Sequence, residues 1–176
     1  MKLRVPSSKS ITQRVLVITA LTKGKTEIIN PLFSEDTKYL INAFNKLGTT
    51  KKVSLGNNGT GVRFLTAFCT ITNFTATVTG NKRMQARPIK DLVTALNQLG
   101  AKVSCKNGCP PVKIEGKGTI KGGNIKLKGN LSSQYLSAIL LIAPHAQNDD
   151  TIEIIGELTS KPYVDITIDV MKDFGV

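Results

Sequence analysis

Apolar residues follow two helical patterns along this chain, and the patterns alternate. In the first pattern the segment is apolar around most of its circumference, which predicts a helix buried on all sides. In the second, apolar residues recur at i, i+3, i+4 and i+7, which predicts a helix with one buried face. The first pattern covers residues 10–21, 62–71 and 135–143, and the second covers residues 37–47, 88–99 and 161–174.

Short segments between these helices are rich in β-branched residues and are bounded by Gly, Pro and Asn, as is typical of strands. The expected strands are residues 2–5, 25–30, 53–55, 75–79, 102–105, 112–115, 125–128 and 151–155. The segment 80–87 is polar and is expected to be a connection without regular structure. Helices alternating with strands predict an α/β fold.

The helices also form an internal repeat. Each fully buried helix follows a Ser- or Gly-rich loop, and the one-sided helices end alike, at Gly48, Gly100 and Gly175. Three such units predict one domain over residues 1–176 with pseudo-threefold symmetry, an inside-out α/β barrel with apolar helices inside and sheets outside. The loops before the buried helices would then meet at one end. Plain strand–helix alternation without symmetry is the alternative.

The first of these loops carries candidate chemistry. Ser8, Lys9 and Ser10 stand directly before a buried helix, and Arg14 follows about one turn later. Free backbone N–H groups and the helix dipole favour an anion at such a position, and Lys and Arg add positive charge. The alternative is that Ser10 caps the helix and Lys9 is a solvated charge.

The formal net charge of +12 suggests a nucleic-acid-binding domain as another possibility. However, most of the excess comes from scattered lysines, whereas four of the five arginines lie just inside or just before expected helices. Arginines at helix starts favour bidentate anion recognition. With no Trp in the sequence, the aromatic platform of a protein that binds single-stranded nucleic acid is missing. The charge therefore favours small anionic ligands over nucleic acid.

Other compositional features exclude further classes. Three cysteines without a CxxC pair and a single histidine are a poor inventory for a metal site or a disulfide framework, so neither a metal nor another cofactor is expected. No apolar run approaches the length of a membrane span, and the N-terminus lacks a signal-type apolar region. We expect a cytoplasmic, monomeric protein that does not bind membranes.

Five collinear segments resemble the enolpyruvyl transferases, most closely the 5-enolpyruvylshikimate-3-phosphate synthase family, which includes the target of glyphosate. The segments are Ser8-Lys9-Ser10-Ile11 through Arg14, Leu55-Gly56-Asn57-Asn58-Gly59-Thr60 through Arg63, Arg83 through Ile89, Ser132 through Tyr135, and Ser160 through Thr167. The resemblance implies transfer of the enolpyruvyl group of phosphoenolpyruvate to the 5-hydroxyl of shikimate 3-phosphate, a step of aromatic amino acid biosynthesis.

The resemblance also implies roles for particular residues. Shikimate 3-phosphate would be bound by Lys9, Ser10, Arg14, Ser132, Ser133, Gln134, Ser160 and Tyr163. Phosphoenolpyruvate would be bound by Lys9, Gly59, Arg87 and Gln134, and Lys9 would act electrostatically in catalysis. Asn57, Thr60 and Arg63 would shape the loop between strand and helix.

The chain departs from the family in three places. The family has two domains, and the C-terminal domain that supplies its acid–base residues is absent, so the chain would correspond to the N-terminal half. The connection 48–55 is short where many members have additional strands, and Phe64 stands where some members have Pro. We therefore expect weak substrate binding and no turnover by this chain alone.

Three alternatives remain. A UDP-N-acetylglucosamine enolpyruvyl transferase shares the architecture, but its catalytic Cys lies on a mobile loop, which Cys105 and Cys109 do not resemble. A basic nucleic-acid-binding domain rests on charge alone. A structural piece that associates with its missing half is the third.

Overall fold

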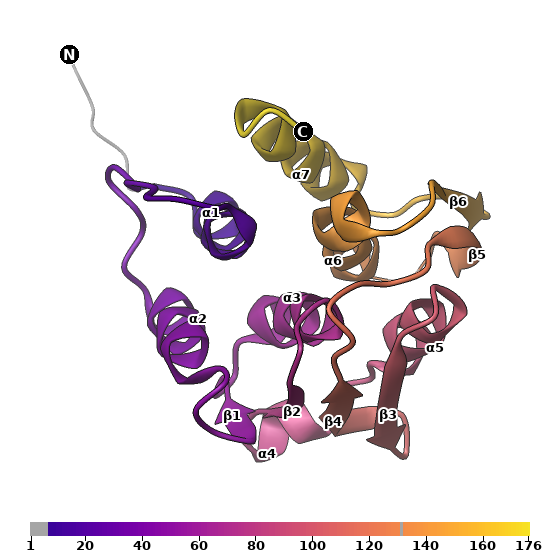
Figure 1. Cartoon of the computed structure of the whole chain (residues 1–176), viewed down its shortest axis with the longest axis horizontal. Helices are drawn as coiled ribbons and strands as arrows, with labels where there is room; N and C mark the ends of the chain where they lie inside the picture. Colours follow the sequence, from indigo (N-terminus) through magenta and orange to yellow (C-terminus); the bar gives the residue numbers. More distant parts are fainter. Residues whose placement is uncertain (1–6, 131) are drawn as a thin grey trace.

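The computed structural model describes residues 7–130 and 132–176 (Figure 1). Its α-helices are α1 (Lys9–Leu21), α2 (Glu35–Lys46), α3 (Gly59–Thr70), α4 (Lys82–Gln85), α5 (Lys90–Gln98), α6 (Ser133–Ile142) and α7 (Lys161–Asp173), and a short 3-10 helix, η1, spans Ala143–His145. Its strands are β1 (Lys52–Ser54), β2 (Thr75–Thr79), β3 (Lys102–Lys106), β4 (Cys109–Glu115), β5 (Gly123–Lys128) and β6 (Asp150–Ile155). The mixed α/β fold class is confirmed.

The strands form two separate sheets. The larger has the order β1-β2-β4-β3, with β1 and β2 parallel and the other neighbours antiparallel. In the smaller, β5 and β6 run parallel from Gly123 opposite Asp150 to Lys128 opposite Ile155. Alternate residues of β4 are buried, which is the pattern of a sheet with one face on the core and one in solvent.

Two of the three helices predicted to be buried on all sides are so. In α3 every residue except Thr60 is buried, and in α6 only Gln134 and Leu140 are not. Figure 1 shows why: α3 lies over the four-stranded sheet and beside α6, and α6 lies between α3, α7 and the smaller sheet. The apolar circumference of each helix is therefore covered by neighbours on several sides.

The prediction was wrong for α1. Ile11 is 42% exposed, and Val15 and Leu16 are only partly buried. The strand predicted at residues 25–30 is also absent, and Ile29 in this segment is 84% exposed. Both errors have one cause. A strand needs a hydrogen-bonded neighbour, and no described strand pairs with residues 25–30. Without a sheet there, one side of α1 stays uncovered. The strand predicted at residues 2–5 lies outside the described residues.

The polar connection 80–87 was also predicted incorrectly, because it contains the short helix α4. Asn81 Oδ1 accepts a hydrogen bond from the backbone N–H of Met84 at 3.0 Å and so caps this helix. Met84 is fully buried and fixes the turn to the core. The helix η1, which follows α6 directly, was not predicted either.

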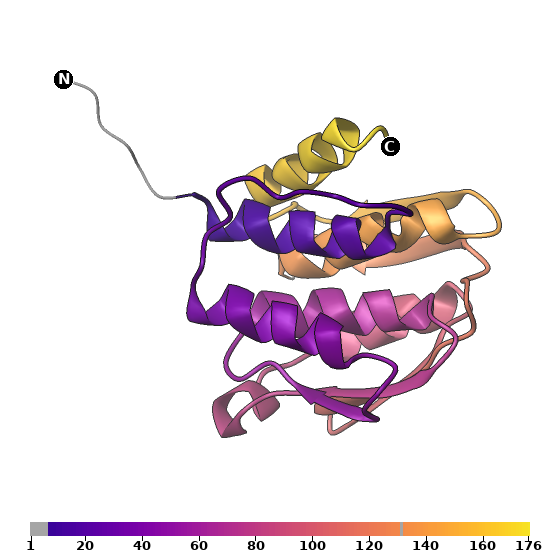
Figure 2. The same cartoon turned by 60° about the vertical axis from the view of Figure 1, so that its left-hand side comes forward.

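The buried apolar residues form one continuous cluster that extends from α1 to α7. Viewed from the side, α1, α2 and α3 run side by side, and the segments that lead into α1 and α2 lie at the same end of the molecule (Figure 2). Across residues 7–130 and 132–176, no helix combines the length and apolar character needed to cross a membrane.

Candidate anion-binding site

Four helix starts surround a cavity of about 340 Å³. The lining residues come from the first turns of α1, α3, α6 and α7 and the residues directly before them, together with Arg14 in the second turn of α1. They are Lys9, Ser10, Arg14, Thr60, Ser132, Ser133, Gln134, Ser160 and Tyr163. All eight residues predicted to bind shikimate 3-phosphate are therefore brought to one cavity, although they come from three separate parts of the chain.

The helix starts at this cavity are electropositive. The first turns of α1, α3, α6 and α7 contain no acidic residue, whereas those of α2 and α5, which do not line the cavity, contain Glu35, Asp36 and Asp91. The helix dipoles at the cavity are thus left uncompensated by carboxylates in the same turn. With no Asp, Glu or His among its lining residues, the cavity favours an anion over a cation.

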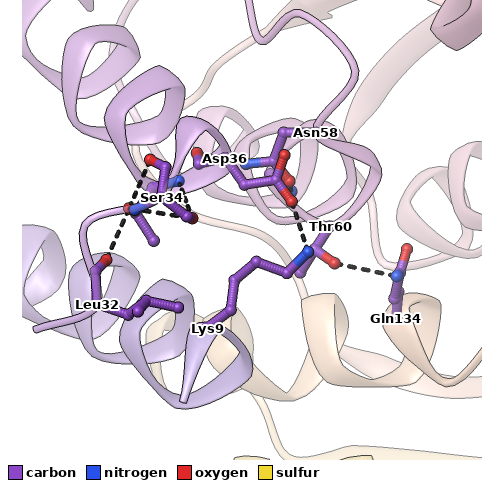
Figure 3. Close-up of polar contacts among 9 residues, drawn as sticks. Lys9, Leu32, Ser34, Asp36, Asn58, Thr60 and Gln134 are labelled. Atoms are coloured by element: carbon purple, nitrogen blue, oxygen red, sulfur yellow. Dashed lines mark hydrogen bonds and ion pairs between the residues drawn. The ribbon is translucent and has the colours of Figure 1, made fainter. Parts of the chain in front are cut away.

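Lys9 is the cation with the greatest freedom to meet a ligand. Its side chain is 50% exposed, and Nζ lies 2.8 Å from Asp36 Oδ2 (Figure 3). Its helix is capped by Ser8, whose hydroxyl accepts a hydrogen bond from the N–H of Ile11 at 3.4 Å. Ser8 therefore caps α1. Ser10, which was considered as the cap, lines the cavity instead.

Arg14 differs from Lys9 because it is only 2% exposed. Nε donates to Thr167 Oγ1 at 2.6 Å, Nη1 to the Ser10 carbonyl at 2.8 Å, and Nη2 to Ser137 Oγ at 3.2 Å and the Tyr163 carbonyl at 2.8 Å. Burial lowers the pKa of this guanidinium to about 10, partly opposed by Tyr163. Arg14 thus ties α1 to α6 and α7 at the cavity, and one N–H of Nη1 has no acceptor among the described residues.

Gln134 connects the starts of α6 and α3. Its Nε2 donates to Thr60 Oγ1 at 3.0 Å, and its buried Oε1 has no hydrogen-bond partner within the described part of the chain. Ser132, predicted to bind the ligand, lines the cavity and also caps α6 by accepting from the Gln134 N–H at 3.3 Å.

Of the residues predicted to hold phosphoenolpyruvate, Lys9 and Gln134 line the cavity, whereas Gly59 and Arg87 lie outside its lining and close to each other. A Cβ on Gly59 would lie 2.4 Å from Arg87 Nη1, so the lack of a side chain at Gly59 allows the Arg87 guanidinium to reach the start of α3. Arg63, expected to shape the loop before α3, is 2% exposed and donates to the carbonyls of Gly59 and Pro88. Burial lowers its pKa, an effect that Tyr135 partly opposes.

Two residues of the site were not assigned from the sequence. Thr60 lines the cavity and accepts from Gln134, although it was expected only to shape its loop. Asp36 pairs with Lys9 across 27 positions of sequence. No local pattern could indicate that contact, because the only visible role of Asp36 in sequence is as an acidic residue in the first turn of a helix.

Comparison with known proteins identifies the family. A family model described as EPSP synthase (3-phosphoshikimate 1-carboxyvinyltransferase) matches residues 1–54 and 50–176. The chain belongs to the EPSP synthase family. It is 42% identical over 201 residues to the 3-phosphoshikimate 1-carboxyvinyltransferase of Sulfurovum sp. (strain NBC37-1), and 42% identical over 203 residues to that of Haemophilus influenzae (strain PittEE). In each case 99% of this chain is aligned with 47% of the relative.

The fold is shared as well. A solved EPSP synthase from Acinetobacter baumannii superposes with a TM-score of 0.81 at 24% sequence identity, covering 91% of this chain and 42% of that one. The chain therefore spans about half the length of the EPSP synthases that it matches. The two segments of the family match meet at residues 50–54, and the alignments of 201 and 203 positions exceed the 176 residues of the chain, so these relatives contain additional residues.

The cysteines and histidine lie outside the cavity lining. Cys69 is buried in the core, where burial raises the pKa of its thiol to about 12, so it is an unreactive thiol at neutral pH. Cys105 and Cys109 lie on the β3–β4 hairpin as free thiols. In the described parts of the chain, no three His, Cys, Asp or Glu residues gather as metal ligands would.

Proposed function

We propose that this chain is the shikimate-3-phosphate-binding half of an enolpyruvyl transferase. The observation that carries this proposal is the cavity itself, in which eight residues chosen by motif meet at the starts of α1, α6 and α7 with no carboxylate among the described residues that line it. Lys9, Ser10, Ser132, Ser133, Ser160 and Tyr163 supply the charge and hydroxyls for the phosphate and ring oxygens. Arg14 and Gln134 line the same cavity and complete the set.

Phosphoenolpyruvate binds next to it, between Lys9, Gly59, Arg87 and Gln134. In the reaction, the 5-oxygen of shikimate 3-phosphate forms a bond to the vinyl carbon of phosphoenolpyruvate, the bond from that carbon to the phosphate oxygen breaks, and the hydroxyl proton leaves with the phosphate. Bringing two anions together requires opposed cations and N–H groups, which this cavity concentrates at one wall.

The chain alone does not catalyse this transfer. Proton movement needs an acid–base group, and the described residues that line the cavity include no Asp, Glu or His. The matched relatives are about twice as long, so we infer that their C-terminal half supplies the opposing wall and the acid–base residues. We accordingly assign residues 1–176 to a single N-terminal domain that functions together with that half.

The arrangement of the elements also favours the pseudo-threefold repeat. In the central unit, β1, α3 and β2 are followed by α5 and the β3–β4 hairpin; in the last, β5, α6 and β6 are followed by α7. In both units the first two strands are parallel neighbours. The first unit contributes α1 and α2 in the same order. We propose that the three units are equivalent and that their apolar helices form the interior of the repeat.

A titration of the isotope-labelled chain with shikimate 3-phosphate, followed by NMR, tests the proposal. We expect amide shifts at the starts of α1, α6 and α7 that saturate at millimolar ligand, and a weaker response to inorganic phosphate, which lacks the ring. Lys9→Met should weaken binding by about tenfold, because charge-assisted hydrogen bonds contribute about 1.5–3 kcal/mol. Lys161→Met, which removes an exposed cation paired with Asp165, is the matched control.

Absence of shifts at these positions at millimolar ligand would contradict the binding assignment. Transferase activity is measured separately, as phosphate release from the two substrates. The chain alone should release none, and adding a recombinant C-terminal half of a relative should restore release. Turnover by the chain alone would overturn the assignment of the acid–base residues to the other half.

A further inference from the structure

The ion pair between Lys9 and Asp36 contains a residue without an assigned role. We propose that Asp36 is a positioning residue that directs the Lys9 ammonium group toward the bound anion; this inference rests on the proposed function of the cavity. Lys9 Nζ and Asp36 Oδ2 are 2.8 Å apart (Figure 3). Among the described residues that line the cavity, only Lys9 forms an ion pair with a residue of another helix.

Asp36 is itself held firmly by the start of α2. Ser34 and Thr37 form a capping box: Ser34 Oγ accepts from the Thr37 N–H at 3.3 Å, and Thr37 Oγ1 accepts from the Ser34 N–H at 2.8 Å. Thr37 Oγ1 also donates to the Leu32 carbonyl at 2.7 Å, and Thr37 is fully buried. The carboxylate at the second residue of α2 also interacts favourably with the helix dipole.

A second contact fixes Asp36 to α3. Its backbone carbonyl accepts a hydrogen bond from Asn58 Nδ2 at 2.8 Å, and Asn58 Oδ1 accepts from the Gly61 N–H at 2.7 Å. Asn58 is fully buried and caps α3. The backbone of Asp36 is therefore attached to the same helix start that carries Thr60, the partner of Gln134 (Figure 3).

The ion pair orients the Lys9 side chain more than it stabilises the fold. The side chains of Lys9 and Asp36 are 50% and 26% exposed, and ion pairs of that kind contribute little to folding. A free lysine side chain, however, carries about 2 kcal/mol of rotamer entropy, which a ligand must overcome when it binds. Asp36 uses one of the three ammonium donors to restrict the side chain and leaves two for the ligand.

Charge and orientation predict opposite effects for Asp36→Asn. If Asp36 acted only as a nearby negative charge, its neutralisation would raise the local positive potential and tighten the binding of any anion. If it positions Lys9, the same substitution weakens the binding of shikimate 3-phosphate. We expect weakening by about fivefold, which corresponds to the upper end of the coupling measured for exposed ion pairs, about 1 kcal/mol.

The first experiment needs no ligand. Proton–nitrogen NMR of the lysine ammonium groups detects those that are shielded from exchange with water by a persistent partner, and Lys9→Met identifies the Lys9 signal. That signal is expected in the wild-type chain and in Asp36→Glu, and it should be lost in Asp36→Asn. Glu153→Gln, which breaks the Lys126–Glu153 pair between β5 and β6, makes the same charge change away from the cavity and should leave the signal intact.

The second experiment titrates the same variants with shikimate 3-phosphate. Asp36→Asn should bind shikimate 3-phosphate about fivefold more weakly than wild type. When Lys9→Met is already present, adding Asp36→Asn should leave the affinity unchanged, because the carboxylate acts through Lys9. Equal or tighter binding by Asp36→Asn, or a Lys9 ammonium signal that persists in it, would overturn the proposal. If the wild-type chain shows no binding, the proposed function fails, and the ammonium signal alone decides whether Asp36 holds Lys9.

Discussion

At the scale of single residues, burial separates cations that look alike in the sequence. Lys9 and Arg87 are exposed at the mouth of the site, whereas Arg14 and Arg63 are 2% exposed and bind backbone carbonyls of neighbouring segments. The guanidinium of Arg14 also lies 5.4 Å from the centre of the Phe64 ring, so this aromatic side chain supports a buried cation. Burial lowers the pKa of Arg14 and Arg63, yet both stay protonated at neutral pH.

The space above Gly59 gives a prediction for Gly59→Ala. The added Cβ would lie 2.4 Å from Arg87 Nη1 and 2.9 Å from Arg63 Nη1, and the exposed Arg87 side chain is the one free to move away. We expect phosphoenolpyruvate, titrated at saturating shikimate 3-phosphate, to bind about tenfold more weakly, because a charge-assisted contact is displaced.

Thermal unfolding of Gly59→Ala should show no loss of stability, since Ala is a better helix residue than Gly by about 1 kcal/mol. Arg87→Gln is the matched variant. It should weaken phosphoenolpyruvate binding to the same degree, and the double variant should be no weaker than either. Additive losses would show that Gly59 and Arg87 act independently.

At the scale of elements, the site depends on how each helix begins. Asn58 caps α3 through the Gly61 N–H and also donates to the carbonyl of Asp36 at the start of α2. Ser132 caps α6, and Ser160, with φ of 57°, precedes α7 without a capping bond from its side chain. Capping thus engages the Ser132 hydroxyl and leaves that of Ser160 without a capping bond, although both residues line the cavity.

Asn58→Ala is therefore predicted to destabilise the fold by about 2 kcal/mol, because one buried side chain loses two hydrogen bonds and leaves their partners unpaired. Urea unfolding measures this loss. The matched control is Asn81→Ala, which removes the cap of the four-residue helix α4 and should cost less than 1 kcal/mol, about half the loss at Asn58. Equal losses at the two positions would show that the link from α3 to α2 adds nothing.

At the scale of the whole molecule, sheets cover α3 and α6 but not α1. The segment after α1 carries Ile29 and Phe33, which are 84% and 68% exposed, and pairs with no described strand. The family match divides at residues 50–54, shortly after α2, and the alignments with the relatives are longer than this chain. The exposed apolar side chains and the division of the family match therefore both lie between the end of α1 and the end of β1.

Apolar side chains exposed in this way favour association of the isolated chain. The double substitution Ile29→Ser with Phe33→Ser should raise the concentration at which light scattering first increases, while the melting temperature changes by no more than about 1 °C, because neither side chain is buried. The pair Ile29→Val with Phe33→Leu keeps the apolar surface and should behave as wild type. A marked fall in melting temperature in the Ser variant would show that both side chains pack in solution.

Much of this structure was predictable because much of it is local. The periodicity of apolar residues predicted all six long helices within a few residues of their observed bounds, and Gly and Pro marked the strands of both sheets. The short helix α4 was missed because four residues contain too little periodicity, and its cap by Asn81 resembles an ordinary turn.

Local patterns were enough to predict where the helices begin, which of them are most apolar, and which cations and hydroxyls stand at their starts, because each of these depends on neighbours within a few positions. Long-range packing established that four of those starts share one cavity, that Arg14 is buried, and that Lys9 pairs with Asp36. The lack of a strand at residues 25–30 likewise depends on distant parts of the chain. The physical reason is the same throughout: hydrogen-bond partners and burial depend on segments far apart in the chain, and no local pattern encodes them.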